Sequence, residues 1–308
     1  MAGGIITTGT HPKALWPGVK AWWGNAYDEF PVEYTDLVDI ETDTRNYVEV
    51  VEDTGFTLGA VKAQGASVVY DANTQGFTMR AVHVTYGLGY IVTMEELQDN
   101  QYESVSKIRA PANAFSMRQT KENIVANIYN RAFNGTYLGP DGKSLCATDH
   151  PLQGGGTLAN KPTVDADLSE ASLEDAIIDL HGFVNAKGLR VSVMPRKLIV
   201  PRQELFNANR ILKSTQQPGN ANNDINAIRV LNAIPEGVAM NHYLTSPHAW
   251  FLRTNVTGGG RGLTLFQRMP IEFDQDNDFD TKNAKAASIE RYSVAWADFR
   301  CIYGVNGP

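Results

Sequence analysis

Cysteine is scarce in this sequence. The 308 residues hold only Cys146 and Cys301, which lie far apart and have no further Cys or His at the spacing of metal ligands. The pair therefore predicts neither a disulfide scaffold nor a zinc site, and we expect both side chains to be reduced thiols.

Long apolar runs are also missing. Nowhere do eighteen apolar residues follow one another, and the N-terminus, MAGGIITTGTHPKALW, has no basic region ahead of an apolar core. We therefore expect a chain that is cytoplasmic when made and has no membrane partner.

Positive charge is in deficit. Lys and Arg number 27 against 34 Asp and Glu, so the net charge is −7 and the pI is near 5.4. A dedicated nucleic-acid binder normally needs a basic surface to neutralise phosphates, so this balance argues against one. It does not exclude a single basic face.

Catalytic and cofactor fingerprints do not stand out, and we expect no cofactor and no metal. Cys146, Asp149 and His150 are close in sequence, but no base or third ligand stands at a useful spacing, so we interpret them as structural. The run Gly258–Gly262 lacks the Lys-Ser/Thr of a P-loop and is better explained as a flexible turn.

Alternating aspartates form one further tempting motif. Asp274, Asp276, Asp278 and Asp280 are spaced as in a calcium loop, but Phe279 replaces the required glycine and Lys285 the required glutamate. This excludes an EF-hand and leaves two alternatives open: a looser divalent-ion site at a subunit contact, or a solvated acidic turn.

What the chain does contain is enough apolar residues for a large core, with abundant Gly, Asn and Thr. Its length favours two interleaved domains or one elaborated fold. From 44 to 90, β-rich runs at 47–51, 67–70 and 77–86 alternate with glycines, which predicts hairpin strands.

Helical periodicity is strongest over 93–133 and 168–187. In the first segment Thr93 and Glu96 form a capping-box pattern, and Pro111 predicts a break or a kink near Ala110 and thus two helical pieces. The second segment has Ser169 or Ser172 as its cap and Gly188 as its stop. Around it, the pattern predicts strands at 190–200, 227–232 and within HYLTSPHAWFLRTNV, and a helix opened by Pro201.

Two stretches resemble a known family. PRKLIVPRQELFNANRIL with the Asn-rich loop after it, and the ending SVAWADFRCIYGVNGP, are similar to the axial domain and closing strand of tailed-bacteriophage major capsid proteins, near the Mu-type head subunits, and occur in the same order. The resemblance implies the α+β phage major capsid fold. Its parts would be an N-terminal arm (1–35), an extended β-hairpin loop (36–92), a peripheral domain with a long spine helix (93–165), a mixed α/β axial domain (166–270), and C-terminal strands returning to the peripheral domain (271–308).

The same resemblance implies a structural function rather than an enzyme. Hexamers and pentamers would close an icosahedral head around double-stranded DNA, with scaffold and portal proteins as partners, in a virion assembled in the bacterial cytoplasm. Glycine and proline positions suggest hinges at Gly55, Gly76 and Pro111. Candidate DNA-facing cations of the spine helix are Lys107, Arg109, Arg118, Lys121 and Arg131.

Aromatic residues supply the candidate intersubunit contacts. The first 35 residues are interpreted as an extended arm whose aromatic side chains pack either on their own domain or on a neighbouring subunit. Together with the hairpin loop, the candidates are Trp16, Trp22, Trp23, Tyr47, Phe56, Tyr70 and Phe77.

Two other functions remain open from sequence. An encapsulin-type nanocompartment would share the fold and enclose enzymes instead of DNA. A metal-dependent hydrolase would use the aspartates at 274–280 and would be a monomer or a small oligomer.

Overall fold

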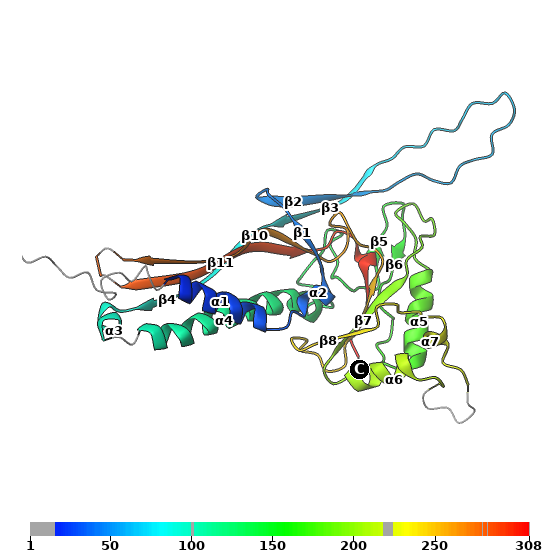
Figure 1. Ribbon diagram of the computed structural model, residues 1–308. Coiled ribbons are helices and arrows are strands. Elements are labelled where there is room, and N and C mark those ends of the chain that lie inside the picture. The colour runs from blue at the N-terminus through cyan, green and yellow to red at the C-terminus, as the bar shows by residue number, and fades with distance from the viewer. Residues whose placement is uncertain (1–15, 100–101, 218–223, 279, 282, 308) are drawn as a thin grey trace, which may run out of the picture.

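The chain folds around two four-stranded sheets that lie in different parts of the molecule. The computed structural model describes residues 16–99, 102–217, 224–278, 280–281 and 283–307. One sheet has the order β1-β10-β11-β4 and belongs to an elongated part, and the other has the order β12-β9-β7-β8 and belongs to a compact part (Figure 1). A two-stranded hairpin, β2-β3, projects from the junction between them.

The sheet of the elongated part is built on a long hairpin. β10 (Thr264–Asn277) and β11 (Ala284–Ala295) are antiparallel, and β4 (Val84–Val92) pairs antiparallel with β11. β1 (Asp39–Thr42) pairs parallel with the start of β10, so strands from both ends of the chain share this sheet.

Helices cover the elongated sheet. α4 (Tyr102–Asn130) runs along it, and α1 (Trp16–Glu29) packs against α4. The short helices α2 (Tyr34–Leu37) and α3 (Met94–Gln98) lie against α4 as well. The charged side chains of Arg118 and Glu122, which lie on the side of α4 away from the sheet, are buried as well. The reason is that α1 and α2 cover that face while the sheet covers the other.

Pro111 does not break the long helix, contrary to the sequence-based expectation. α4 continues through it, and the interruption between α3 and α4 comes about ten residues earlier, around Asp99. Proline in a helix interior removes one backbone donor and costs ~3 kcal/mol or more. Here Ala110 and Ala114 on either side are fully buried, so the packing of α4 holds the helix together.

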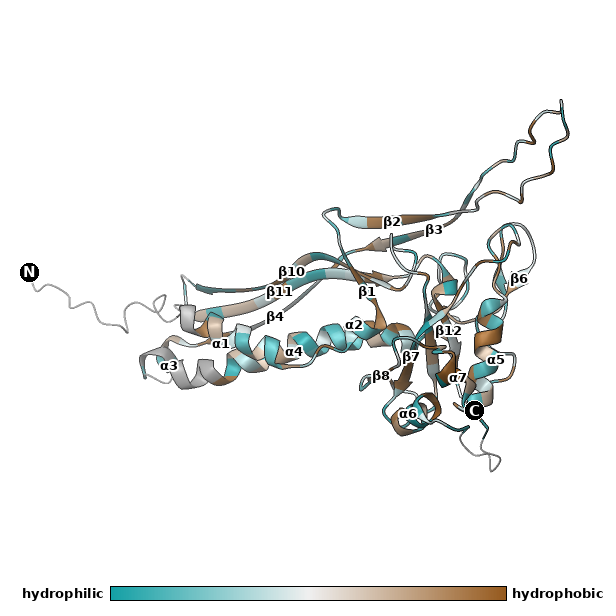
Figure 2. Cartoon of the chain, turned by 45° about the vertical axis from the view of Figure 1, so that its right-hand side comes forward, coloured by the Kyte–Doolittle hydropathy of each residue, from teal (hydrophilic) through white to brown (hydrophobic). Residues whose placement is uncertain are grey.

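The compact part has strongly hydrophobic strands at its centre (Figure 2). β7 (Pro195–Pro201) pairs parallel with β8 (Val238–Asn241) and antiparallel with β9 (Trp250–Thr254), and β12 (Ile302–Val305) pairs antiparallel with β9. Three helices pack around this sheet: α5 (Glu170–His181), α6 (Leu205–Lys213) and α7 (Ala227–Val230).

Several predicted boundaries in the compact part were wrong. α5 does begin after Ser169, whose side chain and that of Ser172 form the capping box, but it ends at Gly182 and not at Gly188. Pro201 is the last residue of β7, and α6 starts only after a turn, at Leu205. Residues 227–232 contain α7 where a strand was expected, because the Asn226 side chain caps a helical turn.

The C-terminal segment is divided between the two sheets. β11 lies in the sheet of the elongated part, whereas β12 completes the sheet of the compact part. The 3-10 turn η3 (Phe299–Cys301) connects them. Two short strands, β5 (His150–Pro151) and β6 (Thr157–Leu158), form a small hairpin in the linking region.

The projecting hairpin consists of β2 (Tyr47–Asp53) and β3 (Gln75–Val82). The loop between them, residues 54–74, extends far beyond the body of the molecule (Figures 1 and 2). We predicted a strand over Ser67–Tyr70, and the structure has none there, because this segment has no neighbouring strand in its own chain.

Candidate interaction surface

Apolar side chains are concentrated on the projecting loop, where they pack against no core. Residues 54–74 have six exposed large hydrophobic side chains, and Tyr70 is 92% exposed. Apolar groups that gather on a protruding segment mark a surface for another molecule. The six residues are Phe56, Leu58, Val61, Val68, Val69 and Tyr70.

The base of this loop is held by hydrogen bonds. The Thr54 hydroxyl donates to the Thr74 carbonyl over 2.8 Å, and the Lys187 ammonium of the compact part donates to the Ala72 carbonyl over 3.0 Å. The Asp71 carboxylate accepts from the backbone N–H and the hydroxyl of Thr57, which lowers the pKa of Asp71. These bonds fix the direction in which the loop leaves the body.

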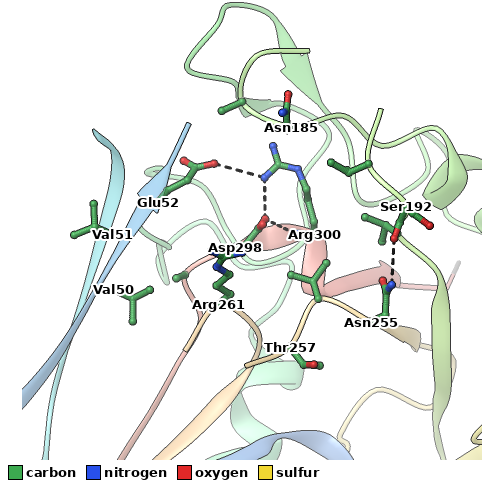
Figure 3. A pocket seen from close by; sticks show the side chains of 15 residues that line it. Val50, Val51, Glu52, Asn185, Ser192, Asn255, Thr257, Arg261, Asp298 and Arg300 are labelled. Carbon is green, nitrogen blue, oxygen red and sulfur yellow. Dashed lines mark hydrogen bonds and ion pairs between the residues drawn. The ribbon is translucent and has the colours of Figure 1, made fainter. Parts of the chain in front are cut away.

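A cavity of about 350 Å³ lies between the base of the hairpin and the compact part (Figure 3). Arg300 forms one wall: its Nε donates to the Val184 carbonyl over 2.8 Å, and its Nη1 donates to Asp298 over 2.9 Å. Nη1 also lies 3.7 Å from a carboxylate oxygen of Glu52 on β2. Arg300 thus ties the hairpin to the compact part.

Glu52 on β2 contacts both Arg300 and β3, the second strand of the hairpin. Burial raises the pKa of its carboxyl, and the Phe77 N–H donates to Oε2 over 3.4 Å. A Cβ added at Gly76 would lie 2.7 Å from the same oxygen, so glycine leaves the room that the carboxylate occupies. At Gly55 the backbone φ is +70°, which also favours glycine. The hinge role of the two glycines stays a prediction.

The predicted contact residues divide into two groups. Tyr47, Phe56 and Tyr70 are exposed on the hairpin, and Phe77 is half-buried at its base. Trp23 is 6% exposed in the core of its own chain, so its assignment to an intersubunit contact was wrong.

Trp23 is fixed there by three contacts. It stacks on Tyr27 and Phe273, with ring centroids 5.1 and 5.2 Å apart, and its indole N–H donates to Asn113 over 2.9 Å. The segment that carries it is the helix α1, not an extended arm. Trp22 is half-buried beside the same core, and the side chain of Trp16 lies outside the described residues.

Most of the candidate DNA-facing cations are engaged within the chain. The buried Arg118 lies over the ring of Tyr27 at 3.8 Å, and Lys121 is also buried, so neither can face DNA. Arg109 pairs with Glu96 over 2.9 Å. Arg131 is exposed, with its guanidinium over the ring of Tyr137 at 4.4 Å, and the side chain of Lys107 lies outside the described residues.

Lys121 forms a buried ion pair that the sequence did not predict. Its Nζ lies 3.2 Å from Oε2 of Glu290 on β11, and the side chains are 2% and 0% exposed. The rings of Tyr34 and Tyr292 lie about 5 Å from the ammonium. Burial raises the pKa of Glu290, and Lys121 acts against that rise. The pair joins α4 to the sheet.

The Cys146, Asp149 and His150 group is structural, in agreement with the sequence interpretation. His150 is buried and stacks on Phe299 with ring centroids 3.9 Å apart. Its Nδ1 lies 2.5 Å from Asp141 and its Nε2 lies 3.0 Å from the Asn160 side-chain oxygen. Burial raises the pKa of Cys146, which makes that thiol a poor nucleophile.

Asn160 is the centre of this cluster. Its amide nitrogen donates to the carbonyls of Leu145, Phe299 and Ile302, at 2.8, 3.1 and 3.2 Å. The linking loop is thereby joined to the C-terminal segment of the chain.

The acidic motif lies at the far end of the β10-β11 hairpin. Asp274 and Asp276 belong to β10, and Asp278 pairs with Lys285 over 2.5 Å, a hydrogen bond that lowers the pKa of Asp278. Within the residues that the structure describes, no three Asp, Glu, His or Cys side chains are placed to hold a metal ion. No helix in the same residues is long and apolar enough to cross a membrane.

The chain is similar to proteins of a known family and to solved structures. A family model described as phage capsid protein matches residues 76–305, well over half of the chain. A comparison with curated protein sequences gives no match.

Solved structures share the fold at low sequence identity. A virus-like particle from Pyrococcus furiosus has a TM-score of 0.51 at 10% identity, covering 94% of this chain and 98% of that one. A chain from Mycobacterium phage Che8 has a TM-score of 0.52 at 12% identity, covering 90% and 93%. The capsid of cyanophage P-SCSP1u has a TM-score of 0.53 at 9% identity, covering 100% and 92%.

Proposed function

This chain belongs to the phage capsid protein family, and from that membership we propose that many copies of it assemble into the icosahedral head of a tailed phage. The observation that carries the proposal is the family match over residues 76–305. Its role in the virion is structural, and we propose that it has no enzymatic activity.

The arrangement of the surface supports self-association. The hairpin loop extends away from the body of the molecule (Figure 1) and its apolar side chains are exposed, which favours another molecule as their cover. Obligate contacts between subunits bury about 2,000 Å² or more, and a long projecting loop enlarges the area that each copy can offer. We propose hexamers and pentamers as the capsomers, with Gly55 and Gly76 as the positions where the hairpin changes direction between them.

The remaining partners belong to the same proposal. Assembly takes place in the host cytoplasm with scaffold and portal proteins, and the closed shell encloses double-stranded DNA. Of the candidate DNA-facing cations whose side chains the structure describes, Arg131 fits best because it is exposed and its guanidinium lies over a ring instead of in an ion pair.

The two other functions considered from sequence are less well supported. The family match favours a phage head over a nanocompartment that encloses enzymes. The hydrolase has no support beyond its aspartates, of which Asp278 is engaged by Lys285.

The deciding experiment is electron microscopy of the purified chain after size-exclusion chromatography, with nucleic-acid absorbance read across the peak. We expect closed shells, or rings of five and six subunits. A chain that stays a monomer or dimer at high concentration and with scaffold added would refute the proposal. The matched control is a chain that lacks residues 54–74, which should fold and stay unassembled.

A further inference from the structure

Asparagine followed directly by glycine occurs at two places in the chain, Asn134 with Gly135 and Asn306 with Gly307. The pair is reactive because the glycine nitrogen lies within reach of the asparagine side-chain carbon and glycine has no Cβ to hinder the approach. The first pair lies in the turn after α4, where the linking loop begins, and the second lies after β12. The two pairs have different surroundings.

The side chain of Asn134 is folded back over its own turn. Its Oδ1 accepts a hydrogen bond from the Thr136 N–H over 2.9 Å, which makes an Asx-turn. The main chain closes the same turn, since the Tyr137 N–H donates to the Asn134 carbonyl over 3.1 Å. An Asx-turn holds the side-chain amide carbon beside the peptide bond that contains the Gly135 nitrogen.

Gly135 is exposed and is not held by other contacts. Its N–H donates to no other residue in the part of the chain that the structure describes, and a Cβ built on it has nothing within 4 Å. Water and hydroxide can therefore reach this N–H, and no hydrogen bond has to break before the nitrogen turns toward the side chain.

We propose that Asn134 is a site of self-modification, in which the Gly135 nitrogen attacks Cγ of Asn134. The new N–Cγ bond closes a succinimide ring, the Cγ–Nδ2 bond breaks, and ammonia leaves with the proton from the Gly135 nitrogen. Water then opens the ring at either carbonyl and leaves an aspartate or an isoaspartate. One asparagine and one water thus give one acidic residue and one ammonia.

The Thr136 N–H favours this attack. Negative charge develops on Oδ1 of Asn134 as the nitrogen adds to Cγ, and the Thr136 N–H already donates to that oxygen. A donor placed where charge develops stabilises the transition state, as in an oxyanion hole. The turn therefore positions the nucleophile and stabilises the charge.

The second pair lacks these features. Gly307 is buried, and a Cβ there would lie 2.5 Å from Cβ of His248, so its backbone is packed against another loop. The residue after it is Pro308, which has no N–H to donate to the Asn306 side chain. Asn306 is therefore a control within the same molecule, with the same two reacting groups.

The modification changes the charge close to the C-terminal end of α4, where the helix dipole disfavours a carboxylate. The new carboxylate also belongs to the same turn as Arg131, whose carbonyl accepts the Asn134 N–H over 2.9 Å. It offsets the charge of this exposed arginine and so weakens its fit to DNA. That last consequence rests on the proposed function, whereas the modification itself does not.

Peptide mass spectrometry of the whole protein tests the site. The purified chain is held at pH 8 for increasing times and then digested with trypsin. Cleavage after Arg131, Lys143 and Arg300 places the two pairs in separate peptides, 132–143 and 301–308. We expect conversion of the amide to an acid to be at least tenfold faster in the first peptide, with two products that separate in chromatography. Equal rates in the two peptides would overturn the inference.

The chain unfolded in urea is the matched control for the effect of the fold. Both pairs lose their surroundings there, so the two rates should become similar. A difference that persists in the unfolded chain would refute the role of the turn, because the local sequence alone would then explain it. Neither result depends on whether the chain assembles, so a failure here is distinct from a failure of the proposed function.

Substitutions in the turn separate the two parts of the argument. Gly135→Ala places a methyl group in open space, so the fold should be unchanged while conversion slows at least tenfold, because the methyl group shields the nitrogen. Thr136→Pro removes the donor to Oδ1 and should slow conversion, whereas Thr136→Ala keeps the N–H and should react like the wild type. Equal rates in the two Thr136 variants would refute the role of this N–H, and an unchanged rate in Gly135→Ala would refute the attack by its nitrogen.

Discussion

Removal of the Lys121 ammonium should destabilise the chain much more at pH 8 than at pH 5. In Lys121→Met, Glu290 remains fully buried beside α4 without its partner. Leaving one member of a buried ion pair uncompensated costs about 3–5 kcal/mol of unfolding free energy. That cost falls on the charged carboxylate, so protonation of Glu290 removes most of it.

The sign of the pH dependence follows from the direction of the pKa shift. Burial raises the pKa of Glu290 in the folded chain, and without Lys121 it should rise further. An acid whose folded pKa lies above its unfolded value, about 4.3, destabilises the protein as pH rises through that window. Each pH unit in the window changes the unfolding free energy by about 1.4 kcal/mol. The defect should therefore be small at pH 5 and approach its full size by pH 8.

Urea unfolding of the unassembled chain, followed by tryptophan fluorescence, measures this effect. With a slope of about 3 kcal/mol per molar urea, the full cost lowers the midpoint by about 1 M or more at pH 8. Adding Glu290→Gln to Lys121→Met should recover most of the loss, because no buried charge remains. Lys285→Met, which removes one partner of a surface pair, should cost less than about 1 kcal/mol. An equal loss at both pH values, or no recovery in the double variant, would refute the reasoning.

Three further predictions concern the hairpin and the linking loop. Gly76→Pro, or deletion of Asp53–Gly76, should leave a folded subunit by circular dichroism that closes no shells in the microscope; normal particles from either would contradict the hinge. Asn160→Ala leaves three buried carbonyls without their donor and should lower the unfolding free energy, measured in urea, by at least about 2 kcal/mol. The control Asn209→Ala loses one hydrogen bond within a helix and should lower it by less than half as much. Tyr70→Ser should not change the stability of the unassembled chain but should reduce the yield of particles, since this side chain is exposed until another copy covers it; an unchanged yield would remove it from the contact.

Local patterns in the sequence predicted the elements that depend on local chemistry. The helix cap at Ser169 or Ser172, the strand through Leu198 and the two strands of the hairpin all follow from neighbouring residues, and the structure has them. The resemblance carried by two short stretches predicted the fold class, which the family match and the shared folds confirm.

The features that the sequence did not predict depend on contacts between residues that are distant in the chain. Trp23 and Arg118 were predicted to contact other molecules. Periodicity could not show that Phe273 lies beside Trp23, or that Tyr27 lies beside Arg118, in the folded chain. The Lys121–Glu290 pair joins residues 169 positions apart, and no local pattern marks it. Pro111 was expected to end a helix because helix propensity does not include the packing that holds both of its sides.

The parallel pairing of β1 with β10 has a consequence for the timing of assembly. Residues 39–42 have no ladder until residues 264–267 have been synthesised, and the base of the hairpin packs on Phe266 and Ala295. Such long-range pairing makes folding slow and postpones it until nearly the whole chain has left the ribosome. The hairpin therefore lacks its anchor until β10 and β11 have been made, so a chain truncated before residue 264 should have no fixed hairpin.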